Sequence, residues 1–89
     1  MGYYGRMAPT PIDDAFTRAL ARELRIALDD AGMTRKALAG ASGIPLRTMV
    51  RYLDAEREVP VSAFMSLCSA MNADAYAILD TADKSAKGQ

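Results

Sequence analysis

The stretch MTRKALAGASGIPLRTMVRYL, which runs from Met33 to Leu53, decides the fold of this chain. It has the pattern of two short helices with a turn between them. Thr34 can cap the first helix, because a threonine side chain accepts a hydrogen bond from a free backbone N–H group of the first turn. Gly43 suits the turn, and Pro45 suits the first turn of the second helix. This layout predicts a helix-turn-helix over about residues 34–54.

The same stretch carries four basic side chains and no acid, in a chain whose formal net charge is zero. The four are Arg35, Lys36, Arg47 and Arg51. Arg47 and Arg51 are four residues apart and therefore lie on the same side of a helix. A segment without acids is typical of a surface that binds a polyanion, so the distribution of charge says more here than its sum.

Helical patterns flank the motif on both sides and predict an all-α fold, a compact bundle of about five short helices. Residues 13–32 have apolar side chains at helical spacing, and residues 61–71 show the same spacing. A last short helix is expected over residues 75–81. The residues placed to cap or end these helices are Gly32, Asn72 and Asp74.

The chain length of 89 residues allows one small domain. We assign this domain to residues 12–81. Residues 1–11 hold two glycines and two prolines, which predicts a flexible arm. The polar residues 82–89 predict a flexible tail.

The composition argues against an enzyme and against a bound metal or cofactor. The chain has no histidine and a single cysteine, Cys68, so transition-metal clusters and histidine-based catalytic groups are not expected. Cys68 lies in an apolar segment, where a small buried side chain is expected. Paired carboxylates lie at the expected helix ends, where they serve as caps. No small-molecule ligand is evident in the sequence.

The longest apolar runs are too short for a membrane span or for the core of a secretion signal. The sequence therefore predicts a protein that does not associate with membranes. A cytoplasmic location is expected.

The segment MTRKALAGASGIPLRTMVRYLDAEREVP, from Met33 to Pro60, resembles the helix-turn-helix of the phage repressor and Cro-like (XRE-type) family of small bacterial and phage DNA-binding proteins. In that family the first helix of the motif opens with Ser or Thr and a polar residue and then reaches a Leu-Ala pair. A branched apolar residue follows the turn glycine. The segment AMNADAYAIL, residues 70–79, is similar to the family's closing segment. The matching motif residues are Thr34, Arg35, Leu38, Ala39, Gly43, Ile44 and Met49.

The resemblance covers about Ala19 to Leu79 and implies a lambda-repressor-like DNA-binding domain. Two positions depart from the family pattern. Pro45 stands where the second helix of the motif often opens with Ser or Thr. The usual Glu-x-Gly after that helix is replaced by Leu53, Asp54 and Ala55, and the missing glycine bears on the geometry of the following loop.

The resemblance implies a sequence-specific regulator of transcription, a phage or bacterial repressor, that binds a double-stranded DNA operator. The third helix of the bundle would lie in the major groove and read base edges with Leu46, Arg47, Val50 and Arg51. Each arginine can donate two hydrogen bonds to guanine, whereas Leu46 and Val50 can contact thymine methyl groups.

Phosphate contacts are expected from the start of the second helix, where Thr34, Arg35 and Lys36 meet the positive end of the helix dipole. Arg57, in the loop after the third helix, is a further candidate, and Thr48 is a weaker one. Arg6 in the N-terminal arm can reach an adjacent minor groove, although a disordered leader is the simpler interpretation of that arm.

Other interpretations of these charges remain open on the sequence alone. Arg47 and Arg51 can instead form a solvated helix face next to Asp54, and the position of the family's reading residues favours DNA over this interpretation. Three arginines of the first helix are expected to pair with nearby acids. The arginines are Arg18, Arg22 and Arg25, and the acids are Asp14, Glu23 and Asp29.

A homodimer through the C-terminal helices is expected for a repressor of this kind. Tyr76, Ile78 and Leu79 suit either its apolar patch or a cover for the core. Two functional alternatives also remain. The helix-turn-helix fold can be a protein-interaction module, such as an antirepressor or an antitoxin, because Leu46 and Val50 are apolar. The chain can also be the N-terminal DNA-binding part of a longer immunity-type repressor.

Overall fold

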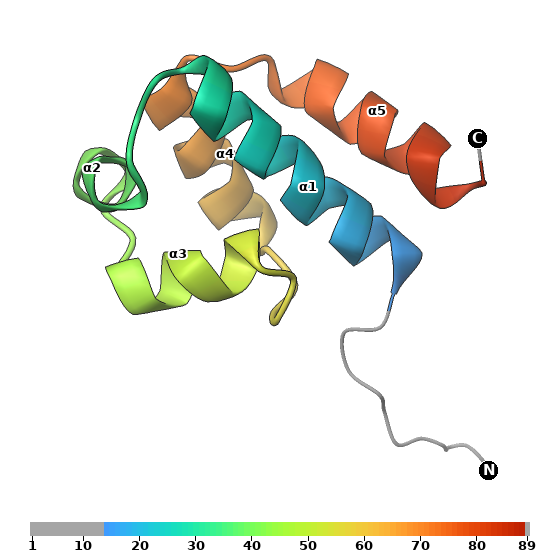
Figure 1. The fold of residues 1–89 in the computed structure, drawn as a ribbon, viewed down its shortest axis with the longest axis horizontal. Helices are drawn as coiled ribbons and strands as arrows, with labels where there is room; N and C mark the ends of the chain where they lie inside the picture. Colours follow the sequence, from blue (N-terminus) through green and yellow to red (C-terminus); the bar gives the residue numbers. More distant parts are fainter. Residues whose placement is uncertain (1–13, 89) are drawn as a thin grey trace, which may run out of the picture.

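Five α-helices make up most of residues 14–88, the part of the chain that the structure, a computed structural model, describes (Figure 1). No strand occurs in that range, so the prediction of an all-α bundle of about five helices is confirmed. The N-terminal arm with Arg6 lies outside the described residues. The helices are α1 (Ala15–Asp30), α2 (Arg35–Ser42), α3 (Leu46–Leu53), α4 (Val61–Met71) and α5 (Ala75–Ala86).

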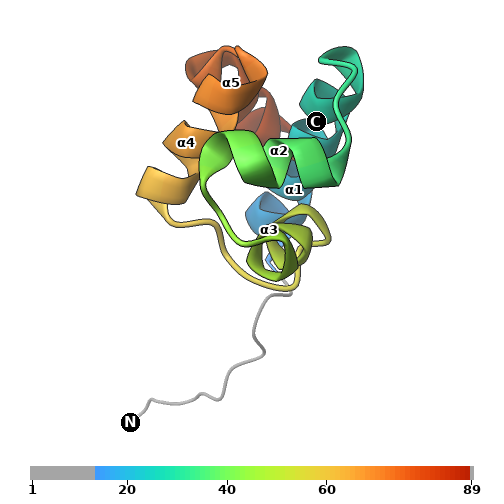
Figure 2. The same ribbon diagram turned by 90° about the vertical axis from the view of Figure 1, so that its left-hand side faces the viewer.

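The long helix α1 organises the bundle. It packs against α5 on one side and against α3 on the other, and the two helices lie on opposite sides of it in both views (Figures 1 and 2). The helices α1 and α5 lie side by side and run in opposite directions (Figure 1). The helix α2 packs against both α3 and α4. As a result, α3 lies at the edge of the molecule, below α2 in Figure 2.

The core draws on every helix. Each of the five contributes at least one side chain with no exposed surface. Cys68 is buried in the same cluster, as expected. Burial raises the pKa of its thiol, and the nearby Asp74 carboxylate raises it further, which keeps the thiol protonated and unreactive. The fully buried residues are Leu24, Leu38, Met49, Leu53, Leu67 and Ala82.

The last helix is longer than the sequence predicts. We expected it to end near residue 81 and residues 82–89 to form a flexible tail, but α5 runs to Ala86. Ala82 has no exposed surface, and the Arg22 guanidinium of α1 donates a hydrogen bond to Ser85 Oγ at 2.6 Å. The polar composition of residues 82–89 predicted a tail because it gives little weight to a single small residue such as Ala82. The burial of Ala82 and the contact of Ser85 with Arg22 accompany the additional turns of the helix.

Side chains cap the start of three helices as predicted, and at α1 Asp14 Oδ1 accepts a hydrogen bond from Phe16 N at 2.9 Å. Thr34 Oγ1 accepts a hydrogen bond from Ala37 N at 3.0 Å at the start of α2. Asp74 Oδ1 accepts one from Ala77 N at 3.1 Å at the start of α5. The sequence predicts that Pro45 lies in the first turn of α3. It is instead the residue just before the helix, which begins at Leu46.

Each of the five helices is followed within two positions by a residue in the left-handed conformation, including Gly88 after α5 with φ of 85°. The glycines after α1 and α2 and Asn72 after α4 adopt it as predicted, with φ of 67° at Gly32, 76° at Gly43 and 55° at Asn72. After α3 the residue is Ala55, with φ of 60°. Two hydrogen bonds close this end, from Ala55 N to the carbonyl of Tyr52 and from Glu56 N to that of Arg51. Ala55 therefore adopts at this helix end the conformation that glycine usually supplies.

The left-handed turn at Ala55 costs stability, because its Cβ is strained there by about 1–2 kcal/mol. We expect Ala55→Gly to raise the free energy of unfolding by about 0.5–1 kcal/mol, since glycine removes the strain but adds entropy to the unfolded chain. Urea unfolding followed by circular dichroism measures this change.

The matched control is Ala41→Gly on the exposed side of α2, where the backbone is helical. This variant should lose about 0.5–1 kcal/mol of stability. Equal losses in the two variants would contradict the strained turn.

Candidate nucleic-acid interface

The helix α3 has one buried and one exposed side. Met49, Tyr52 and Leu53 are buried in the core. At 100° per residue, Arg47 and Arg51 lie on the opposite side, and both are exposed. The structure therefore brings the two predicted reading arginines together on the outer face of α3.

The two apolar reading candidates lie on one flank of these arginines, between the outer side and the buried side of α3. Leu46, the first residue of the helix, is 43% exposed, and Val50 is half-buried. Helical geometry places Val50 between Leu46 and Arg51 around the helix axis. Thr48 lies at the other flank and is also half-buried. Arg47, Arg51 and the partly exposed Val50 are thus neighbours around α3, and Leu46 is exposed at the start of the helix.

The side chains of both predicted reading arginines lack a polar partner among residues 14–88. The side chains of Arg47 and Arg51 form no hydrogen bond or ion pair with any of these residues. Asp54, the acid that follows the helix, binds another arginine instead. Two free guanidinium groups on one helix face are suited to bidentate hydrogen bonds with guanine.

The N-terminus of α2 adds a positive, exposed surface. Lys36 and Thr34 are exposed, and the Thr34 hydroxyl is held as the helix cap. Free backbone N–H groups and the helix dipole favour an anion at such an end. Arg35, the third predicted phosphate ligand here, binds Asp54 with 3.1 Å between Nη1 and Oδ1.

The remaining phosphate candidate, Arg57, lies exposed in the loop between α3 and α4. Its sequence neighbours Glu56 and Glu58 are exposed as well. The acid-free character of the motif therefore stops at the end of α3. Arg57 could bind a phosphate only if its side chain extends beyond the carboxylates of Glu56 and Glu58, which would repel that phosphate.

Two arginines from other helices hold the C-terminal end of α3. The Arg25 guanidinium of α1 donates a short hydrogen bond to the carbonyl of Leu53, and Arg35 of α2 binds the Asp54 carboxylate. Free carbonyl groups give a helix C-terminus its partial negative charge, and cations stabilise it. These two contacts connect the C-terminal end of α3 to α1 and to α2.

Sequence reasoning missed the part played by Arg25. We expected the arginines of α1 to pair with acids close by in the sequence. The only ion pair of this kind that involves Arg22 or Arg25 within residues 14–88 joins Arg22 to Glu23, with 3.9 Å between nitrogen and oxygen. Arg25 instead reaches a backbone carbonyl 28 positions away. A carbonyl has no sequence signature, so no pattern could have revealed this contact.

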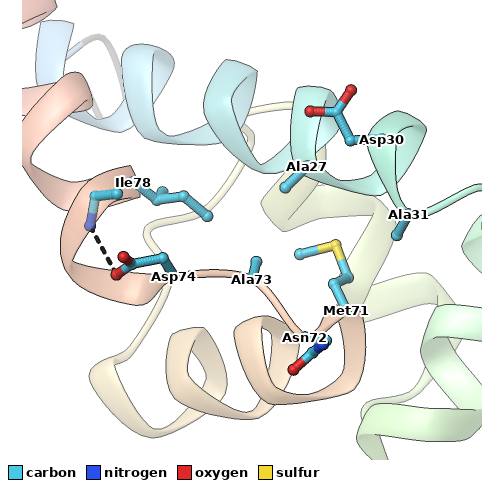
Figure 3. A pocket seen from close by; sticks show the side chains of 9 residues that line it. Ala27, Asp30, Ala31, Met71, Asn72, Ala73, Asp74 and Ile78 are labelled. Atoms are coloured by element: carbon cyan, nitrogen blue, oxygen red, sulfur yellow. Dashed lines mark hydrogen bonds between the residues drawn. The ribbon is translucent and has the colours of Figure 1, made fainter.

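A shallow hollow lies far from α3, between the end of α1 and the α4–α5 junction (Figure 3). Small side chains line most of it, and the larger Met71 and Ile78 reach toward it. The acids Asp30 and Asp74 also border the hollow. It offers carboxylates and no basic group among its lining residues, so we do not assign it to the nucleic-acid interface.

Residues 14–88 contain neither of two other kinds of site. No helix in this range has both the length and the apolar character that crossing a membrane requires. No three side chains among its cysteine, aspartate and glutamate residues come together in a way that could hold a metal ion.

The chain is similar to one solved regulator. The crystal structure of the clp gene regulator ClgR from C. glutamicum superposes with a TM-score of 0.76 and 28% sequence identity. The superposition covers 83% of this chain and 96% of that chain. No protein-family model matches the sequence, and no curated protein matches it.

The contact of Arg25 with the end of α3 generates a stability prediction. We expect Arg25→Met, which keeps most of the aliphatic stem, to lower the free energy of unfolding by about 1–2 kcal/mol, because the Leu53 carbonyl loses a charged donor. Hydrogen exchange should accelerate most at the amides of α3.

The control is Lys84→Met on α5, which removes an exposed ion pair with Asp80, four residues away on the same helix. It should cost no more than about 0.5 kcal/mol. Similar losses in the two variants would mean that Arg25 does not hold α3.

Proposed function

We propose that this protein is a sequence-specific double-stranded DNA-binding regulator of transcription that acts in the cytoplasm. The observation that carries the proposal is the outer side of α3, where Arg47 and Arg51 stand exposed and uncommitted within residues 14–88. The likeness to a clp gene regulator supports it. The resemblance to the phage repressor and Cro-like family leads us to propose repression by occupation of promoter DNA.

In this proposal, α3 lies in the major groove with its N-terminal residues toward the bases. Arg47 and Arg51 donate to N7 and O6 of guanines, and Leu46 and Val50 contact thymine methyl groups. The operator is therefore expected to combine guanines with neighbouring thymines. The half-burial of Val50 limits it to a methyl group that approaches α3 closely.

Phosphates flank this reading surface. The positive N-terminal end of α2 meets one strand through Thr34 and Lys36, while Arg57 and Thr48 contact phosphate beyond α3. These contacts set the position of the helix on the duplex and carry no base preference. Arg35 lies at the same end of α2, but its guanidinium is already bound to Asp54.

A homodimer is the form that suits an operator with two half-sites about one helical turn apart. Of the three residues that the sequence offers for its apolar patch, Tyr76 is 81% exposed in the first turn of α5. Ile78 and Leu79 are partly buried against the core. Tyr76 is therefore the residue that we place in the dimer contact.

A protein-interaction module is the second candidate, favoured by the 43% exposure of Leu46 at the start of α3. Such a module, acting as an antirepressor or an antitoxin, would use this apolar side chain to bind a partner protein. The two functions differ in their response to DNA. Absence of any DNA binding at low salt would favour the module, because phosphate contacts are strongest there.

The base-reading assignment predicts that Arg47→Ala weakens binding to an operator by about 1–3 kcal/mol, because one bidentate contact to guanine is lost. Operators can be selected from a random pool of duplexes, and gel shifts then measure affinity for the selected duplex and for bulk DNA. Bulk DNA should bind almost as before.

Lys36→Ala is the control, since a lost phosphate contact weakens both duplexes about equally and reduces the salt slope by roughly one. An equal effect of Arg47→Ala on both duplexes would refute its role in base reading.

The dimer assignment predicts that Tyr76→Ser lowers the sedimentation coefficient of the protein at a given concentration, because the exposed ring no longer covers its symmetry mate. Thermal unfolding of the variant at low concentration should change little, since the ring is 81% exposed. Val61→Ser, which alters another exposed apolar residue, is the control. A wild-type protein that sediments as a monomer at every concentration would contradict the dimer.

A further inference from the structure

The ion pair between Arg35 and Asp54 joins the two outer ends of the helix-turn-helix. Arg35 is the first residue of α2, and Asp54 is the C-cap of α3. Their side chains are 36% and 40% exposed, with 3.1 Å between Nη1 and Oδ1. The pair therefore lies within reach of any polyanion that docks on α3 and on the N-terminus of α2.

A carboxylate at this place works against the helix that carries it. The C-terminal end of a helix is negative, so Asp54 is unfavourable there unless a cation compensates. Arg25 already binds the Leu53 carbonyl, and Arg35 takes up the added charge. Asp54 is also the first acid after the basic segment from Met33 to Leu53. Because its charge is unfavourable for α3 itself, its contact with Arg35 points to a role other than stabilising the helix.

The chemistry of the pair is that of an arginine bound to phosphate. A carboxylate and a phosphate both offer anionic oxygens to a guanidinium group, and one excludes the other from the same N–H donor. At the start of α2, the Nη1 group of Arg35 already binds the Asp54 carboxylate. A DNA phosphate at this place would therefore find that donor occupied and would be repelled by the negative charge of Asp54.

We propose that Asp54 is a positioning residue that withholds the charge of Arg35 from DNA phosphates. This inference rests on the proposed function. Asp54 thereby lowers the affinity of the protein for all DNA and reduces the salt dependence of binding, without changing the choice of bases. The expected contribution of Arg35 to phosphate binding is switched off in the wild-type chain.

The test compares Asp54→Asn with a matched control, Asp83→Asn. Asp83 also lies near the end of a helix, α5, and binds Lys87 at 3.0 Å, so both variants remove one negative charge and one ion pair. Asp54→Asn should tighten binding to both the selected duplex and a random-sequence duplex, by roughly tenfold at 0.1 M NaCl. It should also make the slope of log K against log salt steeper by about 0.9, as expected for one more phosphate contact.

Two further variants show whether the effect runs through Arg35. Asp54→Glu keeps the charge and should restore the wild-type slope. In an Arg35→Gln background, Asp54→Asn should change binding no more than Asp83→Asn does. A gain in affinity that persists without Arg35 would overturn the proposal.

The outcomes also separate this inference from the proposed function. If the wild-type protein shows no salt-dependent binding to DNA, both fail. If the wild-type protein binds and Asp54→Asn binds no tighter than Asp83→Asn, only the role of Asp54 fails. If Asp54→Asn melts at lower temperature and binds more weakly, the ion pair is a structural lock between α2 and α3, which overturns the proposal.

Discussion

The outward position of Arg47 and Arg51 depends on the burial of the opposite side of α3 in the core. The helix has eight residues, too few to be stable on its own, and only three of them are buried. Packing of Met49, Tyr52 and Leu53 decides which side faces inward. The hydrogen bond from Arg25 to the Leu53 carbonyl and the ion pair of Arg35 with Asp54 then attach the end of the helix to α1 and to α2. The accessible surface of Arg47 and Arg51 follows from the packing of the opposite side of α3.

The other helices supply the frame that makes these contacts possible. The helix α1 has α5 on one side and α3 on the other, so it places Arg25 within reach of α3 while Arg22 binds the end of α5. Left-handed residues turn the chain sharply after four helices, which lets a short chain fold back on itself repeatedly. At Ala55 the chain adopts the left-handed conformation although alanine disfavours it.

Charge separation gives a neutral chain a surface suited to DNA. Basic groups gather on the outer side of α3 and at the start of α2, and acids line the hollow at the far side of the bundle. Asp54 is the exception, because folding brings it onto a basic residue of the motif. In the proposed function, the strength of phosphate binding depends on how many of the cations stay free, whereas base choice depends on α3.

Local signals in the sequence determined most of the fold. Thr34, Asp74, Gly32 and Gly43 marked helix boundaries because capping and left-handed turns need particular residue types at particular places. Apolar spacing likewise indicated the inner side of α3 and, by exclusion, the outer side with its arginines.

Only the tertiary structure decided which partners these charges have. The contacts of Arg25 with a carbonyl and of Arg35 with Asp54 join positions 28 and 19 residues apart, and the anchoring of α5 by Ala82 depends on a surface of α1. Contacts between distant positions, and contacts to backbone atoms above all, leave no periodic pattern in a single sequence.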